Sequence, residues 1–383
     1  MFDETDVVIV GAGVVGLSAA LGLATLGYQV SIIDKHPIQA QVEGIDKRVY
    51  AFNHASQQLF QTIGAWSHLN QSRLSAYQHM KVWDKVSRGE ISFDARLIAK
   101  ENLGHMVEES VLKEALLKAL KTTSLVKFIE SESVQTITPN ALGVRVQGVN
   151  CEWQSTLLLV ADGALSPCRD KLGITLTQWP YDQEAIVATV KTTRPHQGTA
   201  YQVFTSAGPL AFLPLSDPYM CSIVWSSTEG SALMAMAVDD FNQAITTTFE
   251  DTLGEVTVQG DRHIFPLVMR HADTYVGNHF ALLGDAAHTV HPLAGLGLNI
   301  GLSDVSALLT LIKQHGLQSK RMLGAYQRSR KSEVWQMILV LQGLKAVFMN
   351  TATPVSTLRG LGMKTCQRLL PLKRFLIQQA AGV

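Results

Sequence analysis

Three glycines near the amino terminus have the spacing of a phosphate-binding turn. Gly11, Gly13 and Gly16 follow an apolar β-branched run and open a segment of small residues that ends at Gly27. Gly11 would allow the tight turn, Gly13 would let the backbone approach a pyrophosphate, and Gly16 would let helix and strand pack closely. The helix would then direct its free N–H groups at the phosphates.

Asp34 completes this pattern. It ends a second β-branched run, Val30 to Ile33, and follows the glycine turn by about twenty residues, where a carboxylate accepts hydrogen bonds from a ribose. The stretch therefore predicts a strand, a turn, a helix, a second strand and an acid, which together bind an adenine dinucleotide. The alternative is a glycine turn that only tightens a strand–helix unit.

A second glycine-rich stretch lies late in the chain, after the apolar run Phe280 to Leu283. Its candidate residues are Gly284, Asp285, Pro292, Gly295, Gly297, Leu298 and Asn299. A helix entered through glycines exposes unpaired N–H groups and the positive end of its dipole. Such an end would stabilise the negative charge of a reduced flavin. The alternative is a packing helix that needs small residues.

Other candidates are weaker. Arg48 could pair with phosphate oxygens, or it could be a solvated surface arginine. Asp162 and Gly163 follow a predicted buried strand and would lie at the carboxyl edge of a sheet, where α/β proteins bind ligands, although an ordinary turn would look the same. His288 and His291 lack the carboxylate of a zinc motif, so we predict hydrogen-bonding histidines and no metal site.

Composition indicates a globular chain of two joined domains. It has 383 residues, 46% of them hydrophobic and 17% charged, and no uncharged apolar run long enough to predict a transmembrane helix. The acidic start MFDETD does not resemble a signal peptide, and four scattered cysteines suggest reduced thiols. We therefore expect a cytoplasmic protein.

The pattern of the chain changes between its two halves. Residues 106–120 have the spacing of an amphipathic helix, whereas 184–225 alternate as strands without helices between them, which favours an antiparallel sheet that forms one wall of a cleft. We predict an α/β fold with a Rossmann-like dinucleotide-binding domain and an inserted antiparallel-sheet substrate domain. The expected ranges are 1–75, 101–175 and 270–330 for the first domain, 76–100 and 176–269 for the second, and 331–383 for a helical, basic amphipathic tail.

The tail is a separate electrostatic unit. From Val334 onward the chain has no acidic residue and a net charge of +6, with leucines interleaved among the basic side chains. Such a segment gains about 1 kcal/mol per Lys or Arg near anionic lipid. A helical pair packed on the dinucleotide domain, or an oligomer contact, would show the same periodicity.

With these motifs in place, the chain resembles the class A flavin aromatic hydroxylases related to para-hydroxybenzoate hydroxylase, and most of all the ubiquinone-biosynthesis hydroxylases. The resemblance is carried by the first turn with Asp34, by Asp46-Lys47-Arg48, by Ala161-Asp162-Gly163, by Phe212-Leu213-Pro214-Leu215, by Val224-Trp225, by the stretch from Gly284 to Asn299, and by Leu369 to Arg374. It covers nearly the whole chain.

The resemblance implies FAD as the cofactor and assigns residues to it. Those expected to bind FAD are Gly11, Gly13, Val15, Gly16, Asp34, Lys35, Arg48, Asp162, Gly163, Gly284, Asp285, Pro292, Gly295, Gly297, Leu298 and Asn299. Asp285 would bind the ribityl chain, and the segment from Pro292 onward would line the flavin. Asp162 and Gly163 would also serve the reducing nicotinamide. Candidates to line the active site are Pro292, Gly295, Leu213, Pro214 and Trp225, and no catalytic base is assigned.

The implied reaction is hydroxylation of a polyprenyl phenol or quinol in ubiquinone biosynthesis. NAD(P)H would reduce FAD, and O2 would react at flavin C4a to give the hydroperoxide that transfers oxygen to the ring. We expect work at the inner face of a membrane, with a quinone-biosynthesis complex or a homo-oligomer as possible assemblies and no nucleic acid. The alternatives are a flavin-dependent isoprenoid reductase and a non-catalytic subunit stabilised by FAD.

Overall fold

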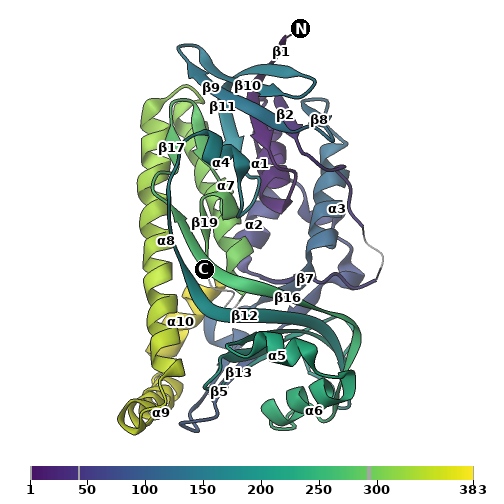
Figure 1. Ribbon diagram of the computed structural model, residues 1–383, viewed down its shortest axis with the longest axis vertical. Helices are drawn as coiled ribbons and strands as arrows, with labels where there is room; N and C mark the ends of the chain where they lie inside the picture. Colours follow the sequence, from purple (N-terminus) through teal and green to yellow (C-terminus); the bar gives the residue numbers. More distant parts are fainter. Residues whose placement is uncertain (1, 42–43, 291–294, 383) are drawn as a thin grey trace.

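The computed structural model describes residues 2–41, 44–290 and 295–382 and contains two large sheets connected by long strands and by a helical tail (Figure 1). The first sheet has eight strands and contains the amino-terminal turn. Its parallel strands, in spatial order, are β18 (Phe280–Leu282), β11 (Glu152–Val160), β1 (Phe2–Val10), β2 (Val30–Ile33) and β8 (Val126–Ile129). The antiparallel additions are β17 (Val276–Gly277), β10 (Gly143–Gly148) and β9 (Val134–Asn140). The glycine turn is therefore at the carboxyl edge of a parallel sheet.

Helices bury the apolar strands of this sheet. They are α1 (Val14–Thr25), α2 (His54–Thr62), α3 (Glu109–Leu120), α4 (Pro167–Lys171) and α7 (Leu296–His315). The β-branched runs that predicted strands are fully buried, as in Val7 to Ile9, because helices cover the sheet. Asn53 caps α2, since its side chain accepts a hydrogen bond from the Ser56 N–H at 3.0 Å.

One predicted helix begins later than its apolar spacing suggests. Residues 106–120 were expected to be helical, but Met106 and Val107 belong to the strand β7 (Gly104–Glu108), and α3 begins at Glu109. β7 pairs with β3 (Val49–Phe52) and β4 (Ser75–Tyr77) in a small third sheet. A short apolar run fits a strand as well as a helix, and pairing with β3 decides the outcome here.

The second large sheet has eight strands and is antiparallel except between β13 and β5. Its order is β19 (His288–Thr289), β16 (Val256–Ala272), β12 (Leu176–Thr192), β15 (Met220–Ser227), β14 (Pro209–Pro214), β13 (Thr199–Phe204), β5 (His79–Asp84) and β6 (Glu90–Asp94). One face packs in a core with α5 (Gly230–Ala235) and α6 (Val238–Thr248). The opposite face is directed towards the first sheet. The expected α/β fold with an inserted antiparallel sheet and a helical tail is confirmed.

Short 3-10 helices connect these elements: η1 (Trp66–His68), η2 (Gln71–Arg73), η3 (Ala95–Ile98) and η4 (Gly284–Ala286). The domain boundaries drawn from the sequence stay a prediction. Several elements do not respect them: β4, β16 and α8 each run across an expected boundary, and β19, inside the expected first domain, joins the second sheet.

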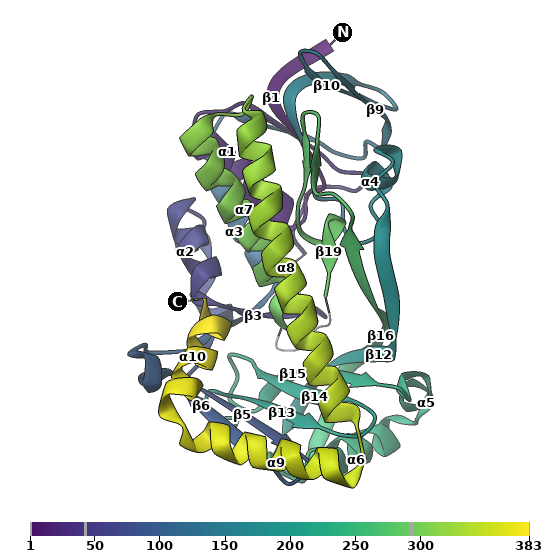
Figure 2. The ribbon, with the colours of Figure 1, turned by 90° about the vertical axis from the view of Figure 1, so that its left-hand side faces the viewer.

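Three helices form the tail (Figure 2). α8 (Lys320–Met349) runs along the molecule from the first sheet to the second, α9 (Thr353–Arg368) lies across the β5–β6 end, and α10 (Leu370–Ala381) returns towards α2. Within the described residues, no helix is long and apolar enough to cross a membrane.

A buried ion pair anchors α9. The Nε atom of Arg359 donates to Oδ2 of Asp84 in β5 at 2.9 Å, and both side chains are almost completely buried. The Nη1 atom of Arg359 also donates to the carbonyls of Phe348 and Asn350, at 3.1 and 3.0 Å, which satisfies acceptors left free where α8 ends. This one guanidinium therefore joins α8, α9 and the substrate-side sheet.

We expect Arg359→Ala to destabilise the folded protein by about 3 kcal/mol or more, because it leaves the Asp84 carboxylate buried without its partner. Urea and thermal unfolding would measure the change. Arg368→Ala removes an exposed arginine from the same helix and serves as the matched control. Equal stability of the two variants would contradict the anchoring role.

Candidate active site

The amino-terminal turn has little room for side chains at two of its three glycines. A Cβ atom added to Gly11, which has a φ of +107°, would lie 2.2 Å from the Ala161 carbonyl oxygen, and one added to Gly16 would lie 1.9 Å from the Gly11 oxygen. Gly13 differs, because it is the extended N-cap of α1 and has no atom within 4 Å of an added Cβ. The space in front of Gly13 is therefore open.

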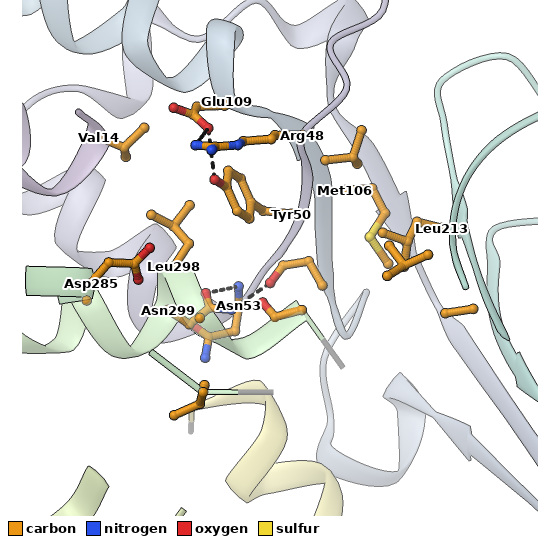
Figure 3. Close-up of a pocket in the computed structure, with 18 of the residues that line it drawn as sticks. Val14, Arg48, Tyr50, Asn53, Met106, Glu109, Leu213, Asp285, Leu298 and Asn299 are labelled. Atoms are coloured by element: carbon orange, nitrogen blue, oxygen red, sulfur yellow. Dashed lines mark hydrogen bonds and ion pairs between the residues drawn. The ribbon is translucent and has the colours of Figure 1, made fainter. Parts of the chain in front are cut away.

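This open space is part of a cavity of about 400 Å³ between the two sheets (Figure 3). The cavity brings together most of the residues selected from the sequence. Those that line it are Gly13, Val15, Arg48, Gly163, Leu213, Gly284, Asp285, Gly295, Gly297, Leu298 and Asn299. The two glycine-rich stretches, far apart in the chain, therefore face the same space.

Other selected residues lie behind or beside the cavity. Gly11 and Gly16 form the tight turn, Lys35 follows Asp34, and Pro214 ends β14. Trp225 is directed into the core on the far face of β15, with its ring centre 5.8 Å from that of Phe241. Pro292 and His291 lie outside the described residues.

The carboxylates of Asp34 and Asp162 each make some hydrogen bonds within the protein and keep capacity to accept others from a ligand. Asp34 accepts the Ala12 N–H at 2.7 Å and the His36 N–H at 2.9 Å, which fixes the turn against β2 and leaves lone pairs for a ribose. Asp162 accepts the Cys168 N–H at 3.1 Å through Oδ2, while its Oδ1 atom is buried without a hydrogen-bond partner. A buried oxygen of this kind fits a ligand donor.

Charged side chains gather on the side of the cavity next to α1 (Figure 3). The Nη1 atom of Arg48 lies 3.0 Å from Oε2 of Glu109, which also accepts the Tyr50 hydroxyl at 2.9 Å. Although burial favours the neutral guanidine, Glu109 raises the pKa of Arg48 above its ordinary value. The cation is therefore permanent and lies where pyrophosphate oxygens would meet it.

Asp285 lines the cavity from η4. Its accessible surface faces the cavity, and burial among the surrounding protein atoms raises the pKa of its carboxyl, against the opposing effects of His288 and Arg48. A carboxyl in this position can accept hydrogen bonds from the hydroxyl groups of a sugar-like chain.

The start of α7 is also directed at the cavity. Gly295 is its N-cap, with a φ of +63° and no side-chain cap, so the first N–H groups of the helix have no partner from a capping side chain. Asn299 holds this helix end in place: its Nδ2 atom donates to the Ala51 carbonyl at 2.7 Å, and its Oδ1 atom accepts the Asn53 N–H at 3.1 Å.

A buried polar cluster supports η4 from behind. Oδ2 of Asp304 accepts the Gly284 N–H at 2.9 Å and lies 2.7 Å from Nε2 of His288, while its Oδ1 atom lies 2.7 Å from Nε of Arg330. Although burial disfavours the charged carboxylate, His288 and Arg330 lower the pKa of Asp304. The hydrogen-bonding role expected of His288 is confirmed, and through Asp304 it fixes the backbone beside Asp285.

Sequence reasoning missed many lining residues on both sides of the cavity. They include Val49, Tyr50, Ala51, Asn53 and Glu109 on the cofactor side, and Tyr77, Met80, Met106, Ala200, Tyr201, Gln202, Pro209, Ala211, Val224, Ser226, Thr289, Val290 and Ala380 elsewhere. Several alternate along strands, as Val224 and Ser226 do on either side of Trp225. Period-two alternation was the available signal, but it does not say which face is directed towards a ligand.

The residues present fit FAD. The open N-cap at Gly13 and Arg48 suit a pyrophosphate, Asp34 a ribose, Asp285 a ribityl chain, and the uncapped start of α7 an anionic ring.

Comparison with known proteins agrees with this geometry. Residues 4–339 match the FAD binding domain family, which defines the class as FAD-binding proteins. The chain is 33% identical to the ubiquinone hydroxylase UbiL of Rhodospirillum rubrum, over 98% of this chain and 89% of that protein. It is also 33% identical to the 3-demethoxyubiquinol 3-hydroxylase of Escherichia coli, over 99% of each. The chain belongs to the family of FAD-dependent hydroxylases that contains these ubiquinone-biosynthesis enzymes.

A solved structure shows the same fold. The p-nitrophenol 4-monooxygenase PnpA of Pseudomonas putida superposes with a TM-score of 0.82 at 16% identity, over 99% of this chain and 98% of that one. The family resemblance, FAD as the cofactor and the aromatic monooxygenase class are confirmed. The residue-by-residue assignments to FAD stay predictions.

We expect Gly13→Val to weaken FAD binding strongly without unfolding the protein. The extended backbone at Gly13 accepts a β-branched residue and no protein atom lies near its Cβ. The side chain would fill the space where the backbone meets the pyrophosphate, and should weaken FAD binding about 100-fold or more. Flavin fluorescence titration and a melting curve of the FAD-free protein would measure both effects.

Gly343→Val, at another glycine with open space around it but on α8, serves as the control. Tight FAD binding by the Gly13→Val protein would show that the turn does not hold the pyrophosphate.

Proposed function

We propose that this protein is an FAD-dependent monooxygenase that hydroxylates the aromatic ring of a prenylated phenol or quinol in ubiquinone biosynthesis. One observation carries the proposal: a single cavity joins a pyrophosphate-type turn, an uncapped helix end and an apolar wall from a separate sheet. The names of the two bacterial relatives supply the substrate class.

The two sides of the cavity have different roles. On one side, Arg48 and the start of α1 bind and orient the cofactor, and the N–H groups at the start of α7 stabilise negative charge on the ring. When bound, FAD supplies the redox chemistry, with NAD(P)H as the reductant and O2 as the source of the oxygen atom.

The opposite side excludes water from the reacting ring. Met80, Leu213 and Val224 contribute apolar surface from three strands of the second sheet. Among the described residues that line the cavity from this sheet, none is charged. An apolar wall positions an aromatic ring and keeps water from the reactive oxygen species.

The tail has an exposed apolar surface suited to a membrane, where a prenylated substrate would be found. We define the tail patch as the exposed apolar side chains of α9, of α10 and of the residue between them, which are Leu358, Leu361, Leu369, Leu370, Leu372, Phe375 and Leu376. Leu358 is 69% exposed, whereas Met363 and Ile377, on the inner faces of the same helices, are buried. The helices are therefore packed on one face and apolar on the other.

The charge of the tail supports an anionic membrane surface as the partner of the tail patch. Lys364, Arg368 and Arg374 are exposed on the same two helices, and the chain has no acidic residue after Glu333. An apolar surface with basic residues fits an anionic lipid bilayer. α10 also reaches the cavity, because Ala380 lines it and accepts a hydrogen bond from Asn53. These features support the proposal that the protein works as a peripheral enzyme at the inner face of a membrane.

Labelled oxygen tests the reaction. With a prenylated phenol, NAD(P)H and 18O2, we expect substrate-stimulated NAD(P)H oxidation and one 18O atom in the product ring, measured by mass spectrometry. Gly13→Val protein without FAD should give neither. Turnover that persists without oxygen would instead indicate a reductase of isoprenoid double bonds, and oxidation without label in the ring would contradict hydroxylation.

Vesicle binding tests the tail patch. Replacing Lys364, Arg368 and Arg374 with Gln should weaken binding to anionic vesicles about 100-fold, at about 1 kcal/mol per residue. Vesicle flotation would measure it, with neutral phosphatidylcholine vesicles for comparison. The control removes three exposed cations elsewhere, Lys121, Lys313 and Arg321.

Equal loss of vesicle binding in both triple variants would mean that the net charge of the protein, and not the tail patch, determines binding. A changed oligomeric state with unchanged vesicle binding would show that the tail patch is a protein contact, within a homo-oligomer or a quinone-biosynthesis complex.

A further inference from the structure

The wall that the second sheet contributes to the cavity is mostly apolar, and its polar side chains are the hydroxyl-bearing Tyr201, Ser226 and Thr289 and a single amide, Gln202, among the described residues. Met80, Ala211, Leu213 and Val224 offer only hydrocarbon or thioether surface, whereas Gln202 on β13 places an amide among them. The neighbouring Tyr201 belongs largely to the opposite face, where its ring packs edge-on against Phe249 at 5.7 Å between centres. Gln202 thus contributes the side-chain amide on the side of the cavity that faces the substrate.

The sheet register surrounds Gln202 with apolar neighbours. It lies opposite Val82 of β5 on one side and Ala211 of β14 on the other, and Ala211 in turn lies opposite Val224 of β15. Val82 is buried, and Ala211 is too small to cover the longer side chain of Gln202. No charged or hydrogen-bonding side chain flanks Gln202 in this row.

The amide of Gln202 makes no hydrogen bond with any described residue, although the residue is only 6% exposed. Gln183, at 4% exposure in the same sheet, shows the usual arrangement: its Nε2 atom donates to the Ala207 carbonyl at 2.9 Å. Neither polar atom of the Gln202 amide is among the fully buried unpaired atoms, so the amide opens to the cavity, where only water or a ligand can satisfy it. Its retention in an apolar wall indicates a partner that arrives with the ligand.

We propose that Gln202 hydrogen-bonds a hydroxyl group on the aromatic ring of the substrate and thereby determines which ring is accepted and how it is oriented. The inference rests on the proposed function and adds the recognition group. An amide can donate to the hydroxyl oxygen and accept its proton, so it matches a neutral phenol or quinol.

The charges of the cavity support a neutral ring. Arg48, Glu109 and Asp285 come from β3, α3 and η4, on the cofactor side. No described residue of the sheet-side wall can stabilise a phenolate by charge. The ring is therefore bound protonated, and the amide selects it by hydrogen bonding in a dry pocket, where a missing hydroxyl would leave the amide without a partner.

Gln202→Met is the informative variant, because it keeps the length of the side chain and removes both hydrogen-bonding groups. The test uses FAD-loaded protein and two ligands with the same short prenyl chain, one with a ring hydroxyl and one with hydrogen in its place. Changes in the flavin absorption spectrum would give the two dissociation constants. Wild-type protein should prefer the hydroxylated ligand by at least about 30-fold.

In Gln202→Met we expect this preference to fall to within about threefold of unity, with the affinity lost only for the hydroxylated ligand. FAD affinity should not change. The melting temperature without ligand should not fall, because an unpartnered amide is removed. Gln178→Met, at an exposed glutamine of β12, is the matched control and should keep the wild-type preference.

An unchanged preference in Gln202→Met would overturn the role of Gln202, even if the wild-type enzyme hydroxylates the ring. A wild-type protein that shows the binding preference but incorporates no 18O would overturn the proposed reaction and leave the recognition role standing. If Gln202→Met lowers the melting temperature, the melting temperature of Gln202→Leu is measured as well. A lower melting temperature in both variants would show that the amide has a structural role, and would contradict the proposal.

Discussion

The parallel pairing of β1, β11 and β18 is the constraint on which the rest of the structure depends. These three strands come from the beginning, the middle and the late part of the chain, yet they end at one edge of one sheet. Their following turns must therefore meet. A Cβ atom added to Gly284 would lie 3.2 Å from Val15, and one added to Gly301 would lie 2.9 Å from it. That closeness places two uncapped helix ends on the same cavity.

Backbone positions set by this pairing are then fixed by buried polar contacts. Asp304 holds η4 through the Gly284 N–H, and Asn299 ties the start of α7 to β3 and α2. Both side chains are buried and hydrogen-bonded several times, so a shift of either turn would leave several partners unsatisfied. The cavity is therefore shaped by residues that need not touch a ligand themselves.

The sequence predicted those features of the fold that depend on residues close together in the chain. Glycine spacing and β-branched runs located both turns, and alternation predicted the antiparallel sheet, because these features depend on neighbours in the chain. The ion pairs Arg48–Glu109 and Asp84–Arg359 join residues that are distant in sequence, and no local pattern predicts them. The direction of Trp225 was equally hidden, since a strand buried on both faces shows which residues alternate but not which face meets a ligand.

The cavity separates its charges from its reacting space. Arg48 and Glu109 pair on the side of the first sheet, where Arg48 would meet an anionic pyrophosphate, and no described lining residue from the second sheet is charged. A charge on that wall would attract water and stabilise ionised ligands in the low-dielectric space where an oxygen atom must be transferred. A neutral amide can select a ring without either effect. Gln202 therefore meets two opposed requirements, the exclusion of water and the recognition of the ring, and this explains why an uncharged amide is retained there rather than an acid or a base.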